Sequence, residues 1–166
     1  SVIDTIQVHD SVERFCKLGA QVEFGEPEFL DEHSIALNGN TLSAKFWVIA
    51  TGSSPAPPRL KAISSLDYIT NKDIFSLDKL PESMIVLGAG PIAMEMAQSF
   101  QRLGTKVRVI QRSGQILSKE DKDMADTVME VLQAEGVQVH LHTQVVDAHQ
   151  QNGVRSITVK DKEGNQ

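Results

Sequence analysis

Apolar and polar residues follow two clear patterns in the second half of the chain, one typical of strands and one typical of helices. A short apolar run at residues 84–87 is followed by apolar positions at helical spacing through residues 92–103, and Gly104 is placed to end that helix. A second apolar run at residues 106–110 predicts another strand. The order strand, helix, strand begins a parallel α/β unit.

A second helix is predicted after this strand. Ser118, followed three residues later by Asp121, indicates a capping box at its start, and Gly136 ends it. A strand at residues 137–141 follows, so the segment has the strand and helix alternation of a Rossmann-like parallel sheet. The apolar positions of the helix share one face, which we expect to be buried: Met124, Val128, Val131 and Leu132.

Beyond this sheet the pattern changes to that of an antiparallel β-meander. Residues 143–148 and 155–160 read as strands on either side of the turn Asn152-Gly153. Residues 162–166 indicate another turn, and a turn with no strand after it would leave the preceding edge unpaired. We therefore expect this segment to have been cut from a longer protein.

The first half contains a helix and several short strands. The helix is predicted at residues 10–18, ended by Gly19, and the turn Asn38-Gly39 favours a tight hairpin. The last predicted strand ends in the apolar run FWVIA, residues 46–50, which suggests burial on both faces, and residues 51–60 read as a linker. The strands are expected at residues 21–24, 28–30, 34–37 and 41–50.

Composition and charge narrow the function classes. The chain has 166 residues and a net charge of -6, which argues against a nucleic-acid partner. It has no apolar run of the roughly 20 residues that span a bilayer, and its first residues lack the basic region followed by an apolar stretch that is typical of a signal peptide. Cys16 is the only cysteine, and its helical spacing suggests a buried thiol. These features predict a soluble, cytoplasmic protein without membrane partners. His140 and His142 have no third ligand in view, so we expect no metal site.

The segment GAGPIA carries the main candidate chemistry. Gly88 directly follows a predicted strand, Gly90 comes two residues later, and Ala93 stands where a third glycine is common. Such a turn needs residues without a Cβ atom, because the backbone approaches a pyrophosphate closely before the helix begins. The motif and its context predict a dinucleotide-binding site; the alternative is a glycine-rich connection that only allows tight packing.

The end of the second strand indicates which nucleotide is bound. NAD-binding units carry an acidic residue about 20 positions after the glycines, whereas an arginine accommodates the 2′-phosphate of NADP. Here Gln111 occupies the acidic position and Arg112 follows it. Gln111 is able to hydrogen-bond a hydroxyl and Arg112 to pair with a phosphate, so NADP(H) is favoured over NAD(H). The alternative for Arg112 is a solvated surface charge.

Two segments together resemble the pyridine nucleotide-disulfide oxidoreductases, a family that includes dihydrolipoamide dehydrogenase, glutathione reductase and mercuric reductase. They are WVIATGSSPAPP and MIVLGAGPIAMEMAQSFQRLGTKVRVIQRSGQIL, and LQAEGVQVHLHTQV extends the match to nearly the whole chain. The resemblance implies an FAD domain interrupted by an NAD(P) domain, in a homodimeric parent protein. Residues 1–54 are then the C-terminal part of the first FAD-domain segment, residues 55–80 a linker, and residues 81–166 an NAD(P)-binding domain truncated before its last strand.

The resemblance also implies roles for individual residues. Thr51 and Gly52 match an ATG motif beside the flavin, Val145 matches a position that touches adenine, and Glu95 matches a helix glutamate that pairs with a lysine near the flavin. Where NADP-using members carry a second arginine, this sequence has Ser118 beside Lys119, which leaves the nucleotide preference open. The residues that match the pyrophosphate and nicotinamide path are Gly88, Ala89, Gly90, Pro91 and Ile92.

The implied reaction is hydride transfer from NAD(P)H to FAD and on to a disulfide-type acceptor. The family's CxxxxC redox pair, its FAD-gripping GxGxxG and its histidine and glutamate acid/base pair are not found in these 166 residues. We therefore assign no catalytic residue and expect this segment to bind the nicotinamide nucleotide. Two alternatives remain: a stand-alone nucleotide-binding module without catalysis, and a single-Rossmann dehydrogenase, for which no acid/base pair follows the glycines.

Overall fold

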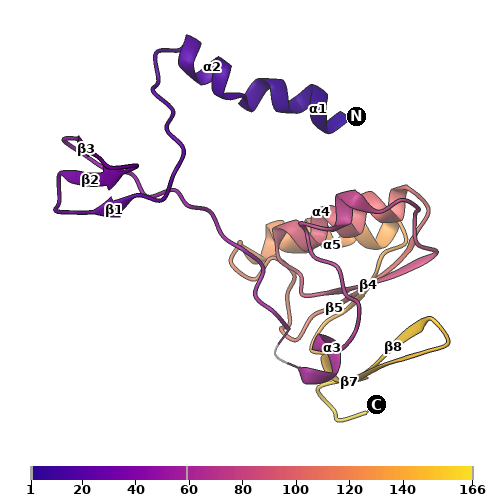
Figure 1. The fold of residues 1–166 in the computed structure, drawn as a ribbon. Helices are drawn as coiled ribbons and strands as arrows, with labels where there is room; N and C mark the ends of the chain where they lie inside the picture. Colours follow the sequence, from indigo (N-terminus) through magenta and orange to yellow (C-terminus); the bar gives the residue numbers. More distant parts are fainter. Residues whose placement is uncertain (1, 59, 166) are drawn as a thin grey trace. The chain divides into compact units, whose positions relative to one another are not determined.

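The computed structural model describes residues 2–58 and 60–165, which fall into two compact units. The first unit, residues 1–53, contains short helices and a small antiparallel sheet. The second, residues 54–166, contains a parallel sheet, two long helices and a β-hairpin. Figure 1 shows both units coloured along the sequence.

The first unit begins with helices and ends with a three-stranded sheet. Its strands pair in the order β1-β2-β3, and Asn38 (φ 51°) and Gly39 (φ 79°) form the predicted turn between β2 and β3. Two predictions for this unit were wrong. Residues 21–24 form no strand, and the strand predicted to extend to residue 50 ends at Ser43. The elements are α1 (Val2–Gln7), the 3-10 helix η1 (Val8–Asp10), α2 (Val12–Lys17), β1 (Glu28–Phe29), β2 (Ser34–Leu37) and β3 (Asn40–Ser43).

Helix α2 confirms the predicted helix but not the predicted burial of its thiol. The Ser11 hydroxyl caps α2 by accepting from the Arg14 N–H at 3.3 Å, and Gly19 (φ 90°) follows its last turn. Cys16 is exposed and no residue of α2 is buried. The prediction of a buried thiol was wrong because helical spacing shows only that a helix has an apolar face. It does not show that another element packs against that face.

The apolar run at residues 46–50 is also exposed. Phe46, Val48 and Ile49 expose 80%, 89% and 74% of their surfaces, and none of these residues lies in a strand. Trp47 alone is partly buried, with its ring edge-on to Phe29 at a centroid distance of 5.9 Å. β3 pairs with β2 only through Asn40–Ser43. A strand requires a hydrogen-bonded neighbour, and an apolar run does not specify one.

The second unit is built on three parallel strands in the order β4-β5-β6. Its helices include α3, which the sequence pattern did not predict, and its hairpin turns at Asn152 (φ 51°) and Gly153 (φ 78°), as predicted. The elements are α3 (Lys61–Ser64), the 3-10 helix η2 (Ile74–Ser76), β4 (Ser83–Leu87), α4 (Pro91–Arg102), β5 (Lys106–Ile110), α5 (Lys122–Ala134), β6 (Gln138–His140), β7 (Gln144–Gln151) and β8 (Val154–Lys160).

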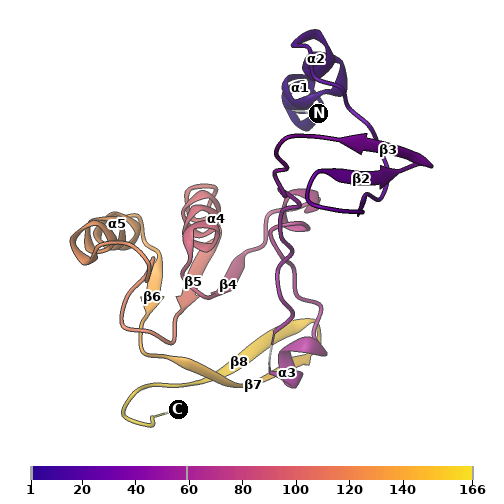
Figure 2. The ribbon, with the colours of Figure 1, turned by 90° about the vertical axis from the view of Figure 1, so that its left-hand side faces the viewer.

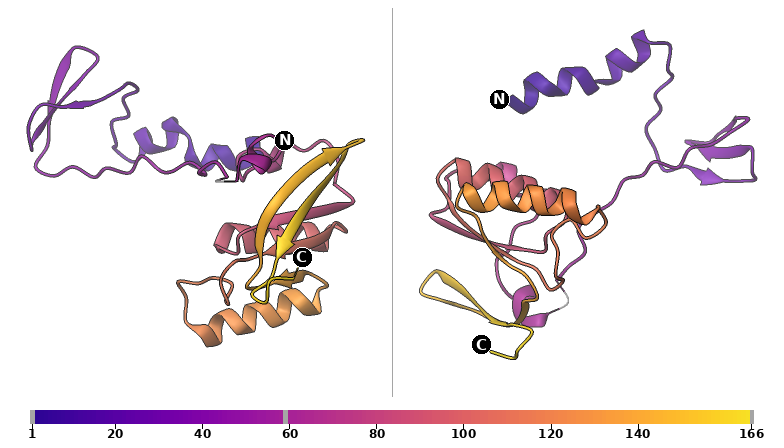
Figure 3. Two further views of the ribbon diagram at one scale, coloured as in Figure 1. Left: turned by 90° about the horizontal axis from the view of Figure 1, so that it is seen from below. Right: turned by 180° about the vertical axis from the view of Figure 1, so that it is seen from behind.

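Helices α4 and α5 lie side by side on one face of the parallel sheet, and the β7–β8 hairpin lies on the other (Figure 2). Right-handed crossovers between parallel strands place both helices on the same face. Figure 3 shows the same arrangement from below and from behind. The hydrophobic core therefore forms between the sheet and the helices, from Met94, Ala97, Phe100, Val107, Val109, Ala125, Leu132 and Val137.

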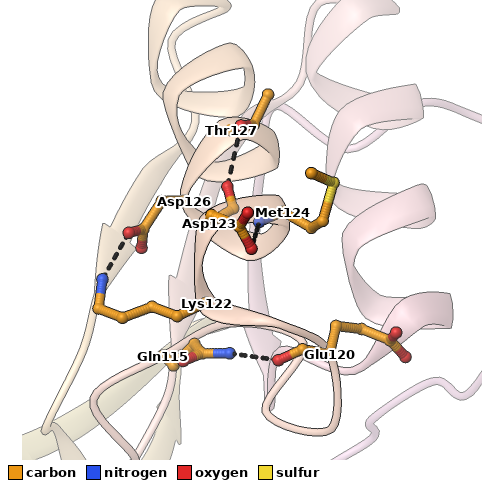
Figure 4. Close-up of polar contacts among 7 residues, drawn as sticks. All are labelled: Gln115, Glu120, Lys122, Asp123, Met124, Asp126 and Thr127. Atoms are coloured by element: carbon orange, nitrogen blue, oxygen red, sulfur yellow. Dashed lines mark hydrogen bonds and ion pairs between the residues drawn. The ribbon is translucent and has the colours of Figure 1, made fainter.

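Helix α5 begins later than the capping box predicts. Asp121 is its N-cap residue but makes no side-chain capping bond, and Ser118 lies in the preceding turn. Leu117 is left-handed (φ 47°), and its carbonyl accepts from the Glu120 N–H at 2.8 Å, which closes that turn before the helix. Figure 4 shows the start of α5, where the Gln115 side-chain amide donates to the Glu120 carbonyl at 3.0 Å.

The buried face of α5 is rotated from the predicted one. Leu132 is 1% exposed, as expected, but Met124, Val128 and Val131 expose 61%, 38% and 45% of their surfaces. The inner stripe instead runs through Ala125, which is 1% exposed, and the partly buried Met129 to Leu132. The sequence contains two adjacent apolar stripes, and packing favours the one with alanine because its small side chain allows the helix to approach the sheet closely.

A polar cluster joins the C-terminal ends of α4 and α5. The Arg102 guanidinium donates through Nε (2.8 Å) and Nη2 to the Glu135 carboxylate, and the Gln98 amide donates to the same group at 3.1 Å. The hydrogen bond from Arg102 is the main cause that lowers the pKa of Glu135 below its ordinary value. The cluster therefore favours the ionised carboxylate in the folded state.

The rotation of α5 predicts a contrast between two neighbouring substitutions. Leu132→Ala leaves a cavity in the core and is expected to lower the free energy of unfolding by about 3 kcal/mol. Val131→Ala removes a half-exposed side chain and is expected to change it by less than about 0.5 kcal/mol. Urea denaturation of both variants measures the difference, and equal losses would show that Val131 is buried as well, as the sequence pattern predicts.

The Arg102–Glu135 pair predicts a pH-dependent contribution to stability. Because the folded-state pKa of Glu135 lies below its ordinary value of 4.5, the contribution is present above that value and is lost as pH falls through the folded pKa. Glu135→Gln should therefore lower Tm at neutral pH by an amount that shrinks in acid. Thermal unfolding from pH 3 to pH 7 checks this, with Glu130→Gln on the exposed side of α5 as control. A Tm difference that grew in acid would contradict it.

Candidate functional site

The connection between β4 and α4 is a sharp elbow at Gly88, Ala89 and Gly90. Gly88 has φ 94°, a left-handed conformation that L side chains rarely adopt, and its N–H donates to the Ile110 carbonyl at 2.9 Å. Ala89 is 2% exposed, and Gly90 (φ -77°, ψ 176°) is the N-cap residue before Pro91. The elbow thus continues the β4–β5 pairing and then turns the chain directly into the helix.

The outer side of this elbow is open. A Cβ atom placed on Gly88 or on Gly90 would meet no heavy atom within 4 Å. By contrast, a Cβ on Gly136 would come within 2.9 Å of the Gln101 side chain. Gly90 is therefore required neither by packing nor by its backbone conformation, and its bare backbone leaves room for the close approach of another group.

The first turn of α4 directs free donors toward this opening. The first hydrogen bond within the helix runs from the Met94 N–H to the Gly90 carbonyl at 3.0 Å. Pro91 has no N–H, so the N–H groups of Ile92 and Ala93 have no acceptor within the helix. These donors and the positive end of the helix dipole favour an anion, as in dinucleotide-binding units.

The loop after β5 lies against the elbow, since the Leu117 N–H donates to the Ala89 carbonyl at 2.7 Å. The Gln111 side-chain nitrogen donates within the loop, to Ser113 Oγ (2.7 Å) and to the Gln115 carbonyl (3.2 Å). Its Oε1 atom has no partner among the described residues. Arg112 is exposed and makes no hydrogen bond or ion pair with them. The loop therefore presents one acceptor and one free guanidinium.

The corner between β6 and β7 is joined to the same loop. The His142 N–H donates to the Ser113 carbonyl at 3.0 Å, and the Thr143 N–H donates to the Gln111 carbonyl at 2.9 Å. Val145 follows on β7, where it is half-buried and pairs with Val159. Sequence reasoning did not include His142 in the nucleotide site, because no local motif links this corner to the loop after β5.

The remaining predicted site residues lie on α4 and in the first unit. Glu95 and Ile92 are exposed, and Glu95 lines a small cavity of about 200 Å³ with Pro91 and residues of α5. Thr51 and Gly52 lie in an exposed segment without regular structure, where Gly52 has φ 70°. No cluster of three or more metal-ligating side chains occurs in residues 2–58 and 60–165. In that same range, no helix has the length and apolar character to cross a membrane.

Comparison with known proteins identifies relatives among flavoprotein reductases. The mercuric reductase of Streptomyces lividans is 32% identical over 151 residues, which are 86% of this chain and 32% of that protein. The mercuric reductase of Bacillus cereus is 34% identical over 119 residues, which are 72% of this chain and 19% of that protein. The chain thus spans about a fifth to a third of the length of these relatives.

Solved structures show the same relationship. The HOCl-induced flavoprotein disulfide reductase RclA from Escherichia coli superposes with a TM-score of 0.65 at 26% identity, over 87% of this chain and 33% of that chain. The water-forming NADH oxidase from Lactobacillus brevis bound to NADH superposes with a TM-score of 0.65 over 89% of this chain and 36% of that chain, and at 22% identity it shows the fold alone.

The sequence profile described as pyridine nucleotide-disulphide oxidoreductase matches residues 5–166. The predicted α/β fold and the predicted family resemblance are both confirmed. The chain belongs to the pyridine nucleotide-disulphide oxidoreductases, a family of FAD-dependent enzymes.

Proposed function

We propose that this chain binds NAD(P)H at the Gly88–Gly90 elbow, in a protein that transfers hydride from the nucleotide to FAD and on to a disulfide-type acceptor. The observation that carries the proposal is the open backbone at Gly90, where neither packing nor φ requires a glycine. Family membership supports the general reaction. The chain has one cysteine, so it does not by itself supply a redox-active pair.

The elbow fits the diphosphate of a dinucleotide. The N–H groups of Ile92 and Ala93 donate to the phosphate oxygens, and the bare backbone from Gly88 through Gly90 allows their close approach. In this proposal, Pro91 and Ile92 line the path of the nicotinamide, and Glu95 lies toward the flavin end of the site. Bound nicotinamide and flavin supply the redox chemistry, while these residues hold the two rings in position.

The loop after β5 holds the adenosine end. Gln111 Oε1 accepts from a ribose hydroxyl, the free Arg112 guanidinium pairs with a 2′-phosphate, and Val145 contacts the adenine. The absence of a carboxylate at position 111 and the unpaired state of Arg112 among the described residues support NADP(H) over NAD(H).

The proposal extends to the organisation of the whole protein. Residues 1–54 belong to an FAD-binding domain, with Thr51 and Gly52 beside the flavin, residues 55–80 form a linker, and residues 81–166 form the nucleotide domain. No Cβ at Gly52 would meet an atom within 4 Å, so its backbone is free to approach a cofactor. We further propose that the whole protein is a cytoplasmic homodimer that binds neither nucleic acid nor membranes. The net charge of -6 supports the absence of a nucleic-acid partner.

Rapid mixing of the purified flavoprotein with NADPH tests the proposed function. Loss of the oxidised-flavin absorbance band is expected, because hydride passes from the nicotinamide to the flavin. Nucleotide binding without any flavin reduction would instead support a stand-alone binding module. Absence of NADPH and NADH binding would overturn the proposal.

Gly90→Ala separates a binding role from a packing role. Because a Cβ fits at Gly90 without contact and its φ is ordinary, the free energy of unfolding should change by less than about 0.5 kcal/mol. The same Cβ lies where the diphosphate approaches, so the Kd for NADPH should rise about tenfold or more. Calorimetric titration measures the Kd, and Ser99→Ala on the exposed side of α4 is the control. Unchanged binding would show that the elbow holds no diphosphate.

Arg112→Gln tests the proposed nucleotide preference. Loss of the guanidinium should raise the Kd for NADPH about fivefold and leave the Kd for NADH unchanged, because only NADPH carries the 2′-phosphate. Titrating each nucleotide into the wild type and the variant measures both constants. An equal loss of affinity for both nucleotides, or no loss for either, would contradict a role for Arg112 in reading the 2′-phosphate.

A further inference from the structure

His142 adopts a left-handed backbone conformation, which is uncommon for residues with a Cβ atom, although histidine adopts it more often than most of them. Its φ of 52° lies in the left-handed region, which residues with a Cβ atom adopt infrequently and which clusters at functional sites. The corner is nevertheless held firmly, because the backbone N–H groups of His142 and Thr143 both donate to carbonyls of the loop after β5. This conformation sets the direction of the histidine side chain.

The imidazole of His142 lies directly against that loop at Gly114. A Cβ atom on Gly114 would come within 2.5 Å of the His142 Cε1 atom and 2.6 Å of Nε2. Gly114 has no left-handed φ, so its backbone conformation does not require a glycine. The absence of a Cβ atom at this position instead leaves space for the His142 imidazole. The Nε2 edge of His142 is thereby placed beside the segment that contains Gln111 and Arg112.

The side chains of His142 and Arg112 are both free to bind a ligand. His142 is exposed, and its ring makes no hydrogen bond or ion pair with residues 2–58 or 60–165. Arg112 is likewise exposed and unpaired within that range. A phosphate dianion has three acceptor oxygens, more than one guanidinium satisfies, and a histidine ring donates an N–H in either its neutral or its protonated form.

We propose that His142 is a nucleotide-binding residue which, with Arg112, holds the 2′-phosphate of NADP(H). The inference rests on the proposed function, because it assumes that the adenosine end of the nucleotide lies at the loop after β5. Within the loop, residues 111–115, Arg112 is the only side chain with a permanent positive charge, and His142 supplies the second N–H donor from a different strand connection. Discrimination between NADP(H) and NAD(H) then depends on a residue well outside the glycine motif.

His142→Asn tests this assignment in the purified protein, with NADPH and NADH as separate probes. Asparagine tolerates the left-handed conformation, so the corner is preserved while the imidazole is removed. The Kd for NADPH should rise about three- to fivefold and the Kd for NADH should stay unchanged. His140→Asn is the matched control, since His140 ends β6 and lines a different cavity with Arg108 and Arg155.

Gly114→Ala provides a second variant that keeps the histidine. The added Cβ displaces the imidazole from the loop, so it should reproduce the loss of NADPH affinity without changing NADH affinity. Equal loss for both nucleotides in His142→Asn, or no loss for either, would overturn the inference while leaving the proposed function intact. A wild-type protein that binds neither nucleotide would overturn both.

Discussion

The reversal of the chain between β4 and α4 is the constraint on which the second unit depends. β4 must end while still paired to β5, and α4 must begin at once in order to cover the sheet, which leaves only Gly88, Ala89 and Gly90 for the turn. The left-handed φ of Gly88 makes this possible, and a residue with a Cβ atom there would be strained. The same turn aims the free N–H groups of the first helical turn out of the elbow. Fold and candidate site therefore share one cause.

The two glycines of the elbow nevertheless serve different purposes. Gly88 is required by its own φ, whether or not a ligand binds. Gly90 has an extended backbone that any residue adopts, and a Cβ there would point into open space. Its identity is thus unexplained by folding, and this makes Gly90 the stronger indicator of a bound group. A glycine motif is more informative once each member is tested separately for conformational need and for packing need.

The sequence predicts best those elements whose signals are local. β5 was expected at residues 106–110 and is Lys106–Ile110, and Gly104 and Gly136 follow α4 and α5 with left-handed φ values. Features that depend on distant partners were not predictable in the same way. The apolar run at residues 46–50 has the composition of a buried strand but no hydrogen-bonded neighbour in its unit, and the two apolar stripes of α5 differ only in how closely they let the helix approach the sheet.

The candidate site shows the same division between local and distant signals. Spacing along the chain identified Gly88, Gly90 and Arg112, because a parallel unit places each at the carboxyl end of its strand. His142 lies at the same edge of the sheet, but it comes from the corner after β6. Its place there is shown only by the hydrogen bond from its N–H to the Ser113 carbonyl and by the packing of its imidazole against Gly114. Parallel strands bring such connections together whatever their separation in sequence. In the proposed function, nucleotide preference is therefore able to change at this corner while the glycine elbow, where we propose that the diphosphate binds, stays the same.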